Sequence, residues 1–129
     1  ENSNILLGEV ASPALRVVYD TGNPVSYKQD AWAYYEAVQD HIVYVHIKDA
    51  NIVDGEAVYC YCGDGQGFVR ETISDLLAKG YDGGFSIEPH LAAVIHTGAT
   101  TDNKEELYNS YTEYGRRLMA IVKEVKAAL

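Results

Sequence analysis

The chain has 129 residues, of which 47% are hydrophobic and 22% charged, a composition typical of one globular domain and not of a disordered or fibrous chain. Nineteen acidic against ten basic side chains give a net charge of −9, which argues against nucleic acid as a partner. We expect neither a membrane span nor an export signal, because no run approaches the ~20 apolar residues that a span needs and no basic, apolar leader opens the chain. Cys60 and Cys62 are the only cysteines and are too close in sequence to bridge usefully, which predicts reduced thiols in a cytoplasmic protein.

Short runs of β-branched and aromatic residues alternate with longer helix-like segments, which is typical of βα units around a parallel sheet. We predict strands over 15–19, 42–47 and 84–87, helices over 30–38, 67–79 and 103–127, and a hairpin within 51–66. Asp54-Gly55 is the turn signal of this hairpin, and we expect the two cysteines beside it to belong to a lid or an oligomer contact. The fold class is therefore α/β, with a single domain over residues 1–129.

Ionisable side chains follow or end each predicted strand. If the strands are parallel, Asp20, His46 and Glu88 share the carboxyl edge of the sheet, where α/β folds place their sites. Two carboxylates and an imidazole suit one divalent ion such as Mn²⁺, Mg²⁺, Co²⁺ or Zn²⁺. The alternative is that the two acidic residues cap helices or face solvent, and that His46 is a core histidine with its hydrogen bonds satisfied.

Several segments resemble, in order and spacing, the successive motifs of one enzyme family. They are residues 18–24 (VYDTGNP), 45–50 (VHIKDA), 63–67 (GDGQG), and 80–83 (GYDG) leading to 86–91 (SIEPHL). They resemble the xylose-isomerase-like TIM barrels, in particular the sugar phosphate isomerase/epimerase group. The resemblance implies a (β/α)8 barrel, which needs about 250 residues. This chain would then supply the last strands, from the end of the fifth to the eighth, and the C-terminal helix, as a fragment or a half-barrel that another copy or chain completes.

The resemblance also implies a ligand set, since such enzymes hold one divalent metal with a Glu, an Asp, a His and a second Glu. Asp20, His46 and Glu88 match the last three positions, and Glu1 in Glu1-Asn2 matches the first. The interval from Glu1 to Asp20 is about ten residues shorter than the usual helical connection. In the family the two glutamates are the acid/base pair, so Glu88 and Glu1 are the implied catalytic residues.

Three further residues flank these positions and are predicted to bind substrate: Lys48, His90 and Asn23. The alternatives are an ion pair of Lys48 with Asp49 or Asp20, a supporting contact of His90 to a ligand, and a turn in which Pro24 keeps Asn23 extended.

The segment 63–67 (GDGQG) leads into a predicted helix but lacks the Lys-Ser/Thr of a P-loop. We predict a flexible turn and no nucleotide cofactor, and phosphate binding by its amides stays open.

The predicted function is a metal-dependent isomerase or epimerase that acts on a ketose, keto-polyol or oxidised glycoside by proton transfer through an enediolate. Dehydration or cleavage of a keto-sugar or keto-inositol by the same enolisation is one alternative, and a non-catalytic half-barrel is another. An endonuclease of the same fold is disfavoured by the acidic charge and by a total of only four histidines. The expected partners are a sugar substrate and either further copies of the chain or a complementing half-barrel.

Overall fold

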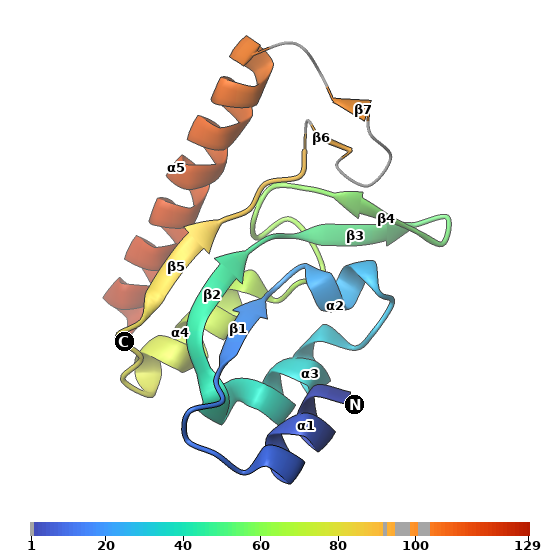
Figure 1. Cartoon of the computed structure of the whole chain (residues 1–129). Helices are drawn as coiled ribbons and strands as arrows, with labels where there is room; N and C mark the ends of the chain where they lie inside the picture. The colour runs from blue at the N-terminus through green and yellow to red at the C-terminus, as the bar shows by residue number, and fades with distance from the viewer. Residues whose placement is uncertain (1, 92, 95–98, 101–103) are drawn as a thin grey trace.

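A computed structural model of the chain describes residues 2–91, 93–94, 99–100 and 104–129 (Figure 1). Its main sheet has three parallel strands in the order β1–β2–β5. The strands are β1 (Val17–Asp20), β2 (Ile42–Ile47) and β5 (Gly84–Ile87). Asp20, His46 and Ser86 pair across the sheet in one register. The predicted α/β class with a parallel sheet is therefore confirmed.

One helix precedes the first strand of this sheet, and others lie between its strands and after the last one (Figure 1). They are α1 (Asn2–Val10), α2 (Asn23–Ser26), α3 (Ala31–Val38), the 3₁₀ turn η1 (Gln39–His41), α4 (Val69–Ala78) and α5 (Lys104–Ala128). Two antiparallel pairs lie outside the sheet: β3 (Ala50–Val53) with β4 (Glu56–Tyr59), and β6 (Ala93–Val94) with β7 (Ala99–Thr100). Among the residues described, no helix has the length and apolarity to cross a membrane.

Helix α3 begins where its sequence predicts. The Asp30 carboxylate accepts a hydrogen bond of 3.0 Å from the Ala33 amide, as an N-cap does. Tyr35 and Val38 on the inner side of the helix are buried. Trp32, the only tryptophan of the chain, packs between Tyr35 and Phe68, with ring centroids 5.0 Å and 5.7 Å away.

Helix α4 begins two residues later than predicted. Phe68 has a left-handed backbone with φ of 51°, so the helix starts at Val69 instead of Gly67. The Phe68 ring is 41% exposed and is not part of the buried stripe of the helix, which includes Ile73 and Leu76. The helical period of the sequence thus predicts the buried face of α4, but it does not predict the left-handed residue before the first turn of the helix.

Two short helices were not predicted. The first of them, α1, lies before Asp20, although that interval is shorter than the usual helical connection. The strand β1 was predicted from residue 15 but starts at Val17, because a turn between Ser12 and Leu15 precedes it. Asn23 begins α2, which contradicts the alternative of a turn with an extended Asn23. Pro24 suits the first turn of that helix, where a missing N–H costs little. The Asp20 carboxylate accepts hydrogen bonds from the amides of Gly22 and Asn23, which turns the chain into α2.

The hairpin of β3 and β4 leaves the carboxyl end of β2 (Figure 1) and has the predicted turn. Asp54 and Gly55 both have positive φ, 50° and 82°, as a two-residue type I′ turn requires. The expectation for the cysteines was wrong for Cys62, which lies in the core with its Sγ 3.7 Å from the carbonyl oxygen of Tyr114. Both thiols are free, and Cys60 is half-buried.

The core lies on one face of the sheet, between its strands and the helices α3, α4 and α5. Its side chains include Tyr19, Val45 and Ile47 from the strands. On the opposite face Val18 is 55% and Tyr44 37% exposed, so part of this apolar face has no cover within the described residues. That a barrel is completed there remains a prediction.

A stability prediction arises from Gly8 in α1. A Cβ at this position would meet no atom within 4 Å, so Gly8→Ala is expected to stabilise the protein by about 0.5–1 kcal/mol through helix propensity. Urea unfolding measures the change. Gly55→Ala is the matched control, because that site is equally open but has φ of +82°, and it is expected to lose about 1 kcal/mol. A loss in Gly8→Ala would contradict the helical assignment of α1.

Candidate metal centre

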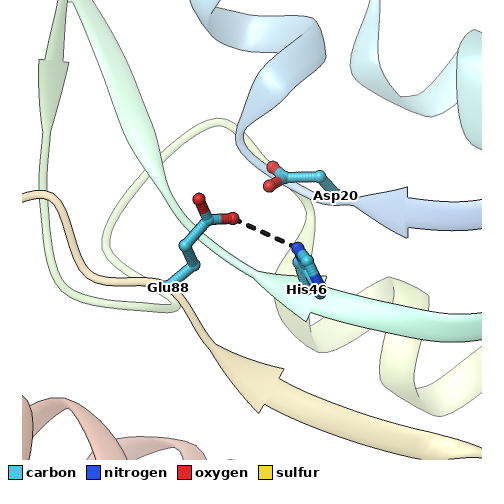
Figure 2. Close-up of side chains that lie close together, drawn as sticks. All are labelled: Asp20, His46 and Glu88. Atoms are coloured by element: carbon cyan, nitrogen blue, oxygen red, sulfur yellow. Dashed lines mark hydrogen bonds and ion pairs between the residues drawn. The ribbon is translucent and has the colours of Figure 1, made fainter. Parts of the chain in front are cut away.

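The ends of the three parallel strands bring Asp20, His46 and Glu88 together, and we call these residues the strand-end cluster. Asp20 ends β1, His46 lies near the end of β2, and Glu88 directly follows β5. One potential ligand atom from each lies within 4.8 Å of the other two. Figure 2 shows the three side chains pointing toward one another, with His46 Nδ1 3.2 Å from Glu88 Oε2. The predicted convergence at the carboxyl edge is therefore present.

Lys48 lies against the cluster from the end of β2. Its Nζ is 3.1 Å from Asp20 Oδ2 and 3.3 Å from Glu88 Oε2, and it donates a 3.1 Å hydrogen bond to Asn23 Oδ1. The lysine side chain is only 5% exposed. Gly22 makes room for it, because a Cβ there would come within 2.7 Å of Lys48 Cγ. The predicted alternative of an ion pair with Asp20 is thus present, and substrate binding by Lys48 stays a prediction.

The pKa values of the two carboxyl groups in the cluster are shifted in opposite directions, upward for Asp20 and downward for Glu88. Burial raises the pKa of Asp20, and the facing Glu88 adds to the rise, while Lys48 opposes it. Burial also acts to raise the pKa of Glu88, but the hydrogen bond with Asp20 and the charge of Lys48 outweigh it and hold that pKa below its usual range. Glu88 is therefore the more readily ionised of the two groups.

The donor set fits one hard or borderline divalent ion. Two carboxylates and an imidazole are oxygen and nitrogen ligands of the kind that Mn²⁺, Mg²⁺, Co²⁺ and Zn²⁺ accept. Without a metal, two facing carboxylates repel each other unless a proton or a cation lies between them. In this structure the Lys48 ammonium supplies such a cation, at 3.1 Å from Asp20 Oδ2 and 3.3 Å from Glu88 Oε2.

A surface pocket of about 820 Å³ lies away from the cluster, where the hairpin and the starts of α3 and α4 meet. None of Asp20, His46 and Glu88 lines it. Its basic side chains Lys28 and Arg70 form ion pairs with glutamates. The pocket and the strand-end cluster are therefore separate features of the protein.

Comparison with known proteins now decides the family. The family model described as a xylose isomerase-like TIM barrel matches residues 5–122. The chain belongs to this family. Neither the search of curated proteins nor that of solved structures gave a match. The xylose isomerase-like TIM barrel has the fold of sugar-processing enzymes, and its members often bind divalent metals.

Of the four metal ligands predicted from the sequence resemblance, three lie in the cluster, and Glu1 lies outside the described residues. His90 is 9% exposed, and its Nε2 is 3.3 Å from Glu88 Oε1, which matches the predicted alternative of a supporting contact to a ligand. Burial and the charge of Lys48 lower the pKa of His90, against the opposing effect of Glu88. Asn23 is exposed and contacts the cluster through Lys48.

Sequence reasoning missed the role of Asp49 in this member of the xylose isomerase-like family. Its buried carboxylate accepts hydrogen bonds of 2.8–3.0 Å from the amides of Ala50, Gly63, Gly65 and Gly67. Burial raises the pKa of Asp49, and these four donors act in the opposite sense. The 63–67 segment is thus tied to the end of β2 instead of being a flexible turn, and Asp49 occupies the amides that phosphate binding would need.

The glycine spacing in this segment was the available signal. A Cβ on Gly65 would come within 2.3 Å of Asp49 Oδ1, and one on Gly67 within 2.8 Å of the same atom. Glycines at alternate positions therefore allow the backbone to wrap closely around a carboxylate. The segment resembles a phosphate-binding loop because its backbone amides also bind an anion, which here is the Asp49 carboxylate of the protein itself.

Proposed function

We propose that the chain forms the metal-binding part of a sugar isomerase or epimerase, with one divalent ion held by Asp20, His46 and Glu88 and by Glu1 as a fourth ligand. The observation that carries the proposal is the convergence of two carboxylates and an imidazole within 4.8 Å at the strand ends of this fold, where barrel enzymes keep their sites. The resemblance of the sequence to the isomerase/epimerase group supports the reaction type.

When bound, a divalent ion would polarise the carbonyl and the adjacent hydroxyl oxygen of a keto-sugar and acidify the C–H bond between them. Glu88 is the proposed base, because its lowered pKa keeps it ionised at neutral pH. Lys48 and His46 contact its Oε2 and hold the carboxylate in place. Glu1 is the proposed acid: a proton given to the same carbon on its opposite face inverts that carbon, and a proton given to the neighbouring carbon results in isomerisation.

Asn23 and His90 are the proposed substrate contacts, since each carries a neutral hydrogen-bonding group beside the cluster. Lys48 would neutralise part of the negative charge that develops on the substrate. The substrate class that follows is a ketose, keto-polyol or oxidised glycoside. A dehydratase or lyase would begin with the same proton abstraction and would differ in the leaving group.

Solvent exchange tests this function. The chain is incubated with Mn²⁺ and a panel of ketoses and ketose phosphates in D₂O, and deuterium at the carbon next to the carbonyl is measured by NMR. We expect label in at least one substrate and none with Glu88→Gln. Loss of water or of a substituent, seen by mass spectrometry, would indicate the dehydratase or lyase. A panel without any label would contradict proton transfer by this site.

The pH dependence of metal binding follows from Asp20. A proton and a divalent ion compete for its carboxylate, and burial raises its pKa. Affinity for Mn²⁺ is therefore expected to fall with decreasing pH, starting above the ordinary aspartate pKa of about 3.9. Titrations at several pH values, followed by electron paramagnetic resonance of free Mn²⁺, measure this. An affinity that stays constant down to the ordinary aspartate range would contradict the role of Asp20.

We also propose that the uncovered face of the sheet packs against further barrel strands, supplied by other copies of the chain or by a complementing half-barrel. Val18 and Tyr44 support this, because they are apolar or aromatic residues exposed on the face opposite the core. The outer edges of β1 and β5 have no strand partner among the described residues, and unpaired edges are sites of strand addition. Substrate would then bind between the cluster and the added strands.

A further inference from the structure

An aromatic side chain of the β3–β4 hairpin contacts His90, the residue that faces Glu88 of the strand-end cluster. Tyr59, the last residue of β4, packs against the His90 imidazole with ring centroids 4.8 Å apart and an angle of 78° between the rings. The Tyr59 hydroxyl lies 3.3 Å from Ser26 Oγ in α2. Tyr59 is therefore fixed between α2 and His90, and it belongs to none of the motifs that carry the family resemblance.

His90 passes this contact on to Glu88. The two oxygens of the Glu88 carboxylate have separate partners: Oε2 faces His46 and Lys48, and Oε1 faces His90 Nε2. Glu88 is 39% exposed and has three rotatable side-chain bonds, so packing alone does not fix its carboxylate. The contact of the His90 imidazole with Oε1 therefore adds to the contacts of His46 and Lys48 with Oε2 in fixing the plane of the carboxylate. Tyr59 in turn limits rotation of the imidazole, since an edge contact of this kind favours one orientation of the two rings.

We propose that Tyr59 is a positioning residue of the metal centre: its ring holds the His90 imidazole against Glu88 Oε1, and thereby orients Glu88 Oε2 toward the ion. This inference rests on the proposed function for the identity of the ligands. Partners of this kind, which orient a ligand without touching the metal, commonly change metal affinity 10- to 100-fold. The hairpin thus acts as part of the site, and the aromatic ring, not the hydroxyl, carries the effect.

The test compares Mn²⁺ affinity, measured by electron paramagnetic resonance, across variants whose folding is checked by circular dichroism. Tyr59→Leu, which keeps much of the side-chain volume, and Tyr59→Ala are expected to weaken binding about 10-fold or more. Tyr59→Phe is expected to stay near wild type because it keeps the ring. Tyr27→Ala is the matched control, since Tyr27 is a 74% exposed tyrosine of the same region and contributes no ligand contact.

A double-mutant comparison separates positioning from general stability. If Tyr59 acts through His90, Tyr59→Leu adds little to the loss of Mn²⁺ affinity already caused by His90→Ala. Full additivity of the two losses, or wild-type affinity in the folded Tyr59→Leu variant, would overturn the inference. A general structural effect of losing the ring would add to the effect of His90→Ala in the double mutant.

A metal-free measurement distinguishes failure of this inference from failure of the proposed function. The ¹⁵N shifts of the His90 ring report the contact of Nε2 with Glu88, and they are expected to change in Tyr59→Leu but not in Tyr59→Phe. Unchanged shifts in Tyr59→Leu would refute the positioning role whether or not the protein binds Mn²⁺. Wild-type protein that binds Mn²⁺ but exchanges no substrate hydrogen would count against the function alone.

Discussion

Replacing Asp20 with asparagine is expected to weaken Mn²⁺ binding by at least about 100-fold, beyond the usual effect of losing a supporting residue. The variant removes one of the two charged ligands in the cluster. Folding should be retained, because an amide oxygen can still accept the hydrogen bonds that Asp20 Oδ1 receives from Gly22 and Asn23. Calorimetric titration and metal content by mass spectrometry measure the loss. Unchanged affinity in Asp20→Asn would remove Asp20 from the ligand set.

Two controls sharpen this result. Asp30→Asn makes the same change at a helix cap, where asparagine is as effective as aspartate, and should leave Mn²⁺ affinity unchanged. The metal-free Asp20→Asn protein is expected to unfold at a lower temperature than wild type, because the buried Lys48 ammonium loses its carboxylate partner Asp20 Oδ2. Burial raises the pKa of Asp20, so removing this charge offsets part of the loss at pH values above that pKa. An unchanged unfolding temperature would indicate that the ion pair with Lys48 contributes little to stability.

Asp49→Asn is expected to cause the largest loss of stability, on the order of 3–5 kcal/mol. Its Oδ1 accepts from Ala50 and Gly67, and its Oδ2 accepts from Gly63 and Gly65. An asparagine would place its NH₂ group against one of these two pairs of N–H donors, so both buried donors would lose their acceptor. Urea unfolding measures the difference, and a shift of the midpoint without a change in slope is expected.

The neighbouring Asp64 supplies the control for this variant. It lies in the same loop but is 57% exposed and pairs with Arg117, so Asp64→Asn should leave the midpoint close to that of wild type. The Asp49 variant should also lose Mn²⁺ affinity only in proportion to its unfolded fraction. If Asp49→Asn were as stable as Asp64→Asn, the carboxylate would not be what holds the 63–67 loop to β2.

The strand-end cluster could be predicted because parallel strands and a two-residue period fix which side chains meet at a sheet edge. The start of α3 was predicted for a similar reason, since it depends on the local cap Asp30, and the helical period of α5 (Lys104–Ala128) follows the predicted helix. The helices α1 and α2 were missed because neither has a strong apolar stripe: α1 buries none of its side chains, and α2 is a single turn.

The partners of Lys48 and Asp49 could not be chosen from the sequence. Both are charged residues at the end of β2, and each could have faced a substrate, the other, or a distant carboxylate. The choice depends on contacts between segments 14 to 40 residues apart, such as Asp49 with Gly63 and Lys48 with Glu88. The order of the motifs along the sequence indicates which residues lie near the site. Whether such a residue binds a substrate or another group of the protein depends on how the chain packs.

Trp32 gives the protein a fluorophore whose position matters for the experiments above. Its aromatic neighbours, Tyr35 and Phe68, belong to α3 and to the start of α4, and neither contacts the strand-end cluster. Its emission therefore reports the junction of these two helices. Unfolding would shift the emission spectrum, whereas Mn²⁺ binding at the strand ends would leave it nearly constant, so intrinsic fluorescence suits the stability measurements and a direct metal signal is needed for affinity.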